Sequence, residues 1–377
     1  MNFRRLRAIA RKEFLHVLRD VRSLILALAL PLVMLLLFGY ALTLDVDQIP
    51  AYVYDQDGTP QSRELIDQFR GSRYFQIVGA VHDYRPIERM VDRSKILIGI
   101  VVPRDYSRNL LAGKETDVQI LLDGSDSNTA SIALGYADAI IQSFSAQLRS
   151  DAQMRLGGQP MKVPVNTEVR VWYNSDLKSK NYIVPGLIAV SMMIIASLLT
   201  SLTIAREYEN GTLEQLLSTP VRPTELVLGK LLAYFAIGLL DMLICLFLGV
   251  VVFAVPFRGS IPFLFFSSCV FLFGALCTGV LISAATRSQL IAYQLSLLTS
   301  FLPAFLLSGF IYSITNMPRV IQIISYIIPA RYFIRIVTSV FLKGVGFEVL
   351  YIELFLLLVY ATIVFIGASR KMRQKLA

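Results

Sequence analysis

Six apolar segments run through the chain, and each is long enough to cross a membrane as a helix. A helix needs about 20 apolar residues to span the hydrocarbon core of a bilayer. Backbone polar groups in lipid must be satisfied within the segment itself, which favours helices. Hydrophobic residues make up 55% of the 377 residues, and charged residues make up 17%. We therefore predict a polytopic α-helical membrane protein with six transmembrane helices. The predicted spans are Ser23–Leu44, Tyr182–Ile204, Leu226–Ala254, Phe263–Ala285, Leu290–Tyr312 and Val349–Ala368.

Basic residues gather on one side of these spans. Seven of them, between Arg4 and Arg22, precede the first span, and four more, between Arg370 and Lys375, lie near the end of the chain. Because Lys and Arg are enriched in cytoplasmic loops, both termini are predicted to lie in the cytoplasm. The segment from Arg319 to Lys343 is the exception, since its four basic residues fall on the predicted outer side.

One long polar stretch, residues 45–180, separates the first two spans and is predicted to be an external α/β domain. It carries 16 basic and 18 acidic residues, so the net charge of +9 belongs to the remainder of the chain. That distribution fits anionic lipid on the cytoplasmic face rather than nucleic acid. Alternating strand and helix patterns indicate the fold class. The predicted strands are Ile49–Tyr54, Phe75–Val78, Ile96–Val102, Val118–Leu122 and Glu168–Tyr173, and the predicted helices are Thr59–Phe69, Pro86–Arg93, Tyr106–Leu111 and Ser127–Met154.

Two shorter segments also carry a pattern. Residues 1–22 place Phe3, Leu6 and Phe14 at helical spacing with arginines on the other faces, which predicts an amphipathic helix on the cytoplasmic membrane surface. A simple topology signal is the alternative.

Residues 318–345 hold two apolar stretches around Pro329. Each stretch is too short to cross the membrane alone, which predicts a re-entrant hairpin. A plain external loop is the alternative there.

A polar island, residues 206–223, lies between the second and third spans on the predicted cytoplasmic side. Gly211 permits a sharp bend, Thr212 followed by Gln215 fits a capping box, and Pro220 stops the helix. Three leucines between them form an apolar stripe. A short capped helix on one face of a membrane is the kind of element that a soluble partner can contact.

The sequence offers little for catalysis. No G-x-x-x-x-G-K-[ST] motif occurs; the pair Gly229-Lys230 is followed by Leu231, and Lys230 is interpreted as a positive anchor at the mouth of a span. The only histidines are His16 and His82, so a His-rich metal site is excluded. A non-enzymatic function is therefore predicted.

Asp241 lies deep in the third predicted span, where a carboxylate is costly. It is either a lining residue for a cationic substrate or a proton, or a structural acid held between helices.

The segment Glu207–Pro220 resembles the coupling-helix signature of ABC-2 type exporter permeases. The pair Pro185-Gly186 at the start of the second span and the segment Leu307–Pro318 are similar to the same family. The large insert between the first two spans resembles the multidrug or drug-export subgroup, and so, more weakly, does Asp123–Ala130.

This resemblance implies a permease subunit of an ABC exporter, driven by a separate ATPase chain that holds ATP and Mg²⁺, with no cofactor on this chain. Residues 1–22 would be a connector helix resting on the ATPase, 23–44 the first span, and 181–377 the permease core. The second and fifth spans would line a path between two permease copies, identical or paralogous. The residues implied for the ATPase contact are Glu207, Glu209, Gly211, Thr212, Leu213, Glu214, Leu216 and Leu217. Those of the connector helix are Phe3, Leu6 and Phe14, and those assigned to the pathway are Asp241, Pro185 and Pro303.

The implied location is the bacterial inner membrane, and the implied cargo is amphipathic: a drug, a lipid or a related molecule. A periplasmic adaptor and an outer-membrane channel are further implied partners, with residues 45–180 as the docking surface. Two alternatives are a mechanotransmission or signalling subunit that moves its external domain without transport, and an ion-coupled carrier centred on Asp241.

Overall fold

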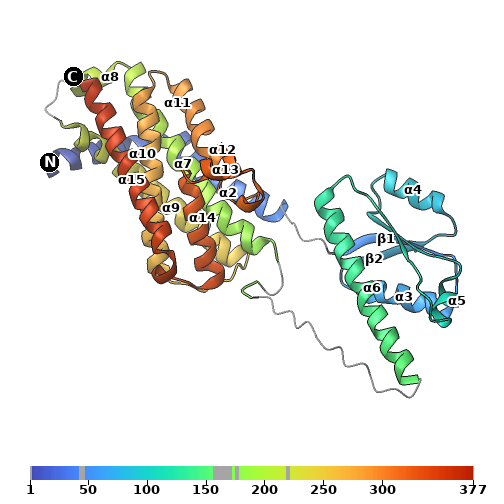
Figure 1. The fold of residues 1–377 in the computed structure, drawn as a ribbon. Helices are drawn as coiled ribbons and strands as arrows, with labels where there is room; N and C mark the ends of the chain where they lie inside the picture. Colours follow the sequence, from blue (N-terminus) through green and yellow to red (C-terminus); the bar gives the residue numbers. More distant parts are fainter. Residues whose placement is uncertain (1, 42–46, 156–171, 175–177, 218–220, 377) are drawn as a thin grey trace. The chain divides into compact units, whose positions relative to one another are not determined.

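The computed structural model describes residues 2–41, 47–155, 172–174, 178–217 and 221–376, and it separates into two compact units. Unit 1 comprises residues 1–43 and 171–377, and unit 2 comprises residues 44–170. Figure 1 shows unit 1 as a bundle of helices and unit 2 as a small sheet flanked by helices.

Unit 2 is an α/β fold built on a four-stranded sheet of order β2-β1-β3-β4. Strands β1 and β2 and strands β1 and β3 pair in parallel, and β4 is antiparallel to β3. The strands are β1 (Ile49–Asp55), β2 (Phe75–Ala80), β3 (Ile98–Val102) and β4 (Gln119–Leu122), and the helices are α3 (Pro60–Gly71), α4 (Tyr84–Asp92), α5 (Tyr106–Leu111) and α6 (Ser127–Arg155). The predicted strand Glu168–Tyr173 lies mostly outside the described residues.

Alternation along β1 explains the two layers of unit 2. Ala51 and Val53 point into a core shared with α3, α5 and α6, while Tyr52 and Tyr54 pack with α4 on the opposite face. Successive side chains of a strand face opposite sides of the sheet, so a single strand supplies both cores.

Among its described residues, unit 1 contains five helices that are long and apolar enough to cross a membrane. They are α7 (Lys180–Glu209), α9 with its π-helical end η1 (Pro223–Val252), α10 (Ile261–Ala285), α11 to α12 (Gln289–Leu306) and α15 (Phe347–Leu376, with the candidate span Phe347–Arg373). The shorter elements are α1 (Phe3–Arg19), α2 (Val21–Ala41), α8 (Thr212–Leu217), η3 (Ile314–Asn316), α13 (Arg319–Ser325) and α14 with η4 (Pro329–Lys343); η2 (Leu297–Phe301) lies between α11 and α12.

The described residues hold five candidate spans, or six if one bent pair of helices is counted as a span, so the predicted number of six stays a prediction. The first predicted span, Ser23–Leu44, corresponds to α2, whose described apolar stretch Ala27–Tyr40 is shorter than the other five. The pair α13 and α14 is bent by 82° at a short break and becomes a sixth candidate span if it is counted as one. This bend suits either a broken span or the predicted re-entrant hairpin.

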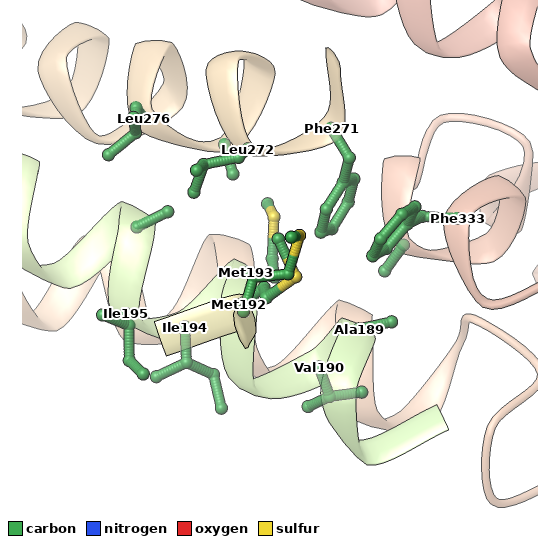
Figure 2. Packing of buried hydrophobic residues seen from close by; sticks show 14 of the residues in the cluster. Ala189, Val190, Met192, Met193, Ile194, Ile195, Phe271, Leu272, Leu276 and Phe333 are labelled. Carbon is green, nitrogen blue, oxygen red and sulfur yellow. The ribbon is translucent and has the colours of Figure 1, made fainter. Parts of the chain in front are cut away.

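Helix α7 is the centre of the bundle. In the most apolar 18-residue stretch of α7, 83% of the residues are buried, and the corresponding share in the other four candidate spans is 22% to 56%. Figure 2 shows Met192 and Met193 of α7 facing Leu272 of α10. Beside them the rings of Phe271 and Phe333 stack, with centroids 4.1 Å apart, which ties α14 to the same core.

Small residues let α7 and α10 approach closely. An ideal Cβ at Gly279 would lie 2.0 Å from Oγ1 of Thr200 and 2.4 Å from the carbonyl oxygen of Ser197. The Thr200 hydroxyl donates to the carbonyl of Leu276 at 2.9 Å across this contact. Such small-residue contacts with interhelical hydrogen bonds are common in membrane bundles.

We expect Gly279→Ala to destabilise unit 1 by about 1–3 kcal/mol, because the added methyl group overpacks a closed contact. A thiol-reactive dye in a thermal scan measures this, since the buried Cys245 and Cys277 both lie in unit 1. Gly346→Ala is the matched control in the same unit, because a Cβ at Gly346 meets nothing within 4 Å. An unchanged midpoint for Gly279→Ala would contradict the packing described.

Candidate functional site

The end of α7 turns sharply into the six-residue helix α8. Gly211 makes the turn with φ of +66°, a left-handed conformation that glycine adopts without strain. Thr212 is already the first residue of α8, and its hydroxyl donates to the carbonyl of Glu207 at 3.3 Å. The bend therefore lies at Gly211, as predicted, and the Thr212 hydroxyl ties the start of α8 to the end of α7. The predicted capping box stays a prediction.

Leu213 fastens α8 to the helix bundle of unit 1. Its side chain is 3% exposed and belongs to the hydrophobic core of unit 1, and α8 packs on α7. Gly211 and Thr212 are exposed. The side chains of Glu214, Leu216 and Leu217 lie outside the described set. Leu213 thus holds the short helix in place.

Glu209, the last residue of α7, is exposed and holds the start of α11. Its Oε1 accepts the backbone N–H of Gln289 at 2.8 Å, and its Oε2 accepts from the Gln289 side-chain amide. On the neighbouring turn, the Arg206 guanidinium lies 3.3 Å from Oε1 of Gln289 and 3.4 Å from Oδ2 of Asp20. The α7–α8 corner is therefore connected to both α11 and the end of α1.

A buried ion cluster, formed by Lys230, Glu13, Glu207 and Lys12, joins three helices beside this corner. Lys230 of α9 is 1% exposed. Its Nζ lies 2.8 Å from Oε1 of Glu13 on α1 and 2.9 Å from Oε1 of Glu207 on α7. The more exposed Lys12 lies 3.4 Å from the same Glu207 oxygen. Lys230 is thus a buried cross-link rather than the interfacial anchor expected from sequence, and Glu207 is engaged within the chain.

Helix α1 docks on α9, and its predicted place on the membrane surface stays a prediction. Its buried residues are Leu6, Ile9, Glu13 and Val17. Of the three residues predicted for this helix, Leu6 is buried, whereas Phe3 and Phe14 are 72% and 42% exposed. The sequence signal that was missed is Glu13: an acid at core spacing in α1, matched by a lysine inside the apolar run of α9.

Close backbone contact and capping hold α1 in this position. An ideal Cβ at Gly229 would lie 2.6 Å from Cγ2 of Ile9, so only glycine at this position lets the helices meet. The Glu225 carboxylate accepts the backbone N–H of Asn2 at 2.6 Å and that of Arg222 at 3.2 Å. It therefore caps α9 and binds the beginning of α1 at the same time.

The residues predicted for a pathway lie on three helices. Pro185 is buried inside α7, and Pro303 lies at the start of α12, which contacts α7. Asp241 is buried on α9, where its Oδ1 accepts from Sγ of Cys245 at 3.7 Å. Its Oδ2 has no hydrogen-bond partner among the described residues.

The described residues contain no group of three or more His, Cys, Asp or Glu side chains placed to hold a metal ion. At the α7–α8 corner, α8 packs on α7, and hydrogen bonds and ion pairs connect the end of α7 to α1, α9 and α11.

Residues 21–370 match the family model described as ABC-2 family transporter protein. The chain is 36% identical over 370 residues to the probable multidrug ABC transporter permease YbhS of Escherichia coli (strain K12), covering 98% of the chain and 96% of that protein. It is 32% identical over 375 residues to the probable multidrug ABC transporter permease YbhR of the same organism, covering 99% of each. An inner membrane transport permease of that organism, YhhJ, is 27% identical over 311 residues, covering 80% of the chain and 79% of that protein.

Proposed function

The chain belongs to the ABC-2 family and is a permease subunit of an ABC transporter; we propose that it works as an exporter of amphipathic molecules. Membership implies an ABC ATPase as partner and a dimer of permeases, in a multi-pass protein of the bacterial inner membrane. The proposed cargo is a drug, a lipid or a related molecule taken from the cytoplasm or the inner leaflet. ATP and Mg²⁺ would bind on the partner, and this chain would perform no catalysis.

The α7–α8 corner carries this proposal. A six-residue helix is held by Leu213 at the end of the most buried helix of the bundle. The ion cluster connects α7 to α1 and α9. A push on α8 is therefore expected to move α7, α9 and α1 together, because packed interiors transmit displacement rather than absorb it. This is the coupling that an external ATPase needs.

Two further assignments follow from the same proposal. Residues 45–180 would face the periplasm and offer a docking surface for an adaptor that leads to an outer-membrane channel. Residues 318–345 would form the re-entrant hairpin, for which the 82° bend between α13 and α14 is the support.

The test is ATP-dependent movement of a labelled amphiphile in inverted membrane vesicles that contain the permease and its ATPase. An exporter accumulates the label inside these vesicles only when ATP is hydrolysed. ATP hydrolysis without net movement of any amphiphile would favour a mechanotransmission subunit. Movement driven by an ion gradient in vesicles without the ATPase would favour a carrier centred on Asp241.

Asp241 is proposed as a pathway residue because one carboxyl oxygen is buried with no partner in the described structure. We expect Asp241→Asn to leave expression and the thermal midpoint of unit 1 unchanged or slightly raised, because it removes the cost of burying a charge. ATP-dependent transport is expected to fall several-fold. Transport equal to that of the original chain would show that Asp241 is a structural acid.

A further inference from the structure

We propose that a cavity between α1, α2, α7 and α9 binds an organic ammonium compound, namely a protonated amine carried on an apolar body of one or two rings. The cavity has a volume of about 260 Å³ and lies wholly within unit 1. A cavity of about 150 Å³ in an engineered protein holds benzene. The space here is therefore sufficient for a larger apolar body together with its polar group.

The cavity has one apolar part and one charged part. The apolar wall includes Leu24 and Ala27 of α2, Leu199 of α7 and Ile237 of α9. The charged wall is the ion cluster described above, together with Asp20 and Arg206. A ligand that fills it must itself be amphipathic, with its polar group next to the ion cluster.

The hydrogen bonds of the charged wall indicate which kind of polar group a ligand needs in order to bind there. Lys230 is already bound by Glu13 and Glu207, and Arg206 is already bound by Asp20 and Gln289. The Glu207 Oε2 atom, by contrast, is buried and has no hydrogen-bond partner in the described part of the chain. The unmet requirement at this oxygen is for a hydrogen-bond donor.

A cationic donor satisfies this requirement better than a neutral one. A hydrogen bond between an ammonium group and a carboxylate is charge-assisted and about twice as strong as one between neutral groups. The wall also carries three cations, Lys12, Arg206 and Lys230, but each already lies within 3.4 Å of a carboxylate oxygen. The unpaired Glu207 oxygen is therefore left for a ligand. The site therefore selects for positive charge on an apolar body.

This inference names a substrate class for the proposed exporter. The role of the ammonium compound as cargo rests on the proposed function, whereas its binding to the cavity does not. Binding is measured without the ATPase, so the two proposals fail separately. Loss of amine binding with intact efflux of other amphiphiles overturns the site alone. Saturable amine binding without ATP-dependent efflux overturns the exporter proposal alone.

The experiment is isothermal titration of the purified full-length chain in lipid nanodiscs. The probe is 2-(2-naphthyl)ethylammonium, and its neutral counterpart is 2-(2-naphthyl)ethanol, which has the same ring system and length. We expect the ammonium compound to bind saturably and at least tenfold more tightly than the alcohol. A cavity filled only by water gives no saturable binding, and equal affinity for the two compounds contradicts a role for charge; either result overturns the proposal.

Two variants locate the site. Glu207→Gln is expected to weaken ammonium binding about 10- to 100-fold, as for loss of a charged hydrogen bond, and to change alcohol binding less than twofold. Ala27→Phe fills the apolar part without touching the ion cluster and is expected to abolish binding of both compounds. Glu353→Gln is the matched control, because Glu353 is a buried, arginine-paired carboxylate on α15, outside the cavity. Unchanged ammonium affinity in Glu207→Gln and Ala27→Phe would show that the probe binds elsewhere.

Discussion

Replacing Lys230 with Met is expected to destabilise unit 1 by about 3–5 kcal/mol and to release α1 from α9. Removing one partner of a buried ion pair leaves an uncompensated charge, and a loss of this size is typical. Here two carboxylates, Glu13 and Glu207, lose their shared cation, and Lys12 at 3.4 Å from Glu207 is too exposed to replace it. The thermal midpoint reported by buried thiols should fall, and trypsin should cleave faster within residues 4–19.

Arg70→Met is the control for this prediction. Arg70 pairs with Asp67 at 3.1 Å on the exposed face of α3, and both side chains are more than 60% exposed. Pairs of this kind contribute little to stability, so the expected change is below about 0.5 kcal/mol. If Lys230→Met behaved like Arg70→Met, the ion cluster would have no part in holding α1.

A second large effect is expected for Leu213→Asp, which should detach α8 and abolish co-purification of the ATPase. Leu213 is 3% exposed, and placing an unpaired carboxylate in its position costs several kcal/mol. Because α8 has only six residues, it cannot remain helical in water without its packing. The permease should still insert, since the spans are unchanged. The measurement is the ATPase-to-permease ratio after affinity purification from membranes.

Leu111→Asp makes the same chemical change at an exposed position in the other unit, where Leu111 of α5 is 73% exposed. It is expected to leave the ATPase ratio as it is. Leu213→Ala, which shortens the buried side chain without adding charge, should give an intermediate ratio. Normal ATPase recovery with Leu213→Asp would mean that the partner is held elsewhere.

Local patterns were enough to predict much of the fold. The helix Tyr106–Leu111 was placed at the bounds that the structure shows, and four of the predicted strands overlap β1 to β4. The sharp corner at Gly211 was also predictable, because a glycine before a short polar helix has a clear conformational reason. These features depend on residues that are close together in the sequence, so they can be predicted from one sequence alone.

The ion cluster could not be predicted in the same way. Glu13 and Lys230 are 217 positions apart, and their pairing depends on how α1 docks on α9. The amphipathic pattern of α1 was read from its apolar residues, among them Phe3, Leu6 and Phe14, and Glu13 was not considered. The fifth span was likewise extended to Tyr312, whereas α12 ends at Leu306. Hydropathy alone does not reveal where an apolar chain leaves its helix.

The central claim is that a separate ATPase docks on α8, and photo-crosslinking in intact membranes tests it most directly. A photoreactive amino acid at Gln215, which is exposed on α8, is compared with one at Glu348, which is exposed at the start of α15, on the predicted opposite side. The account predicts a crosslink from position 215 to an ATP-binding subunit, identified by mass spectrometry, and none to that subunit from position 348. A crosslink to the ATPase from position 348 with none from position 215 would contradict it.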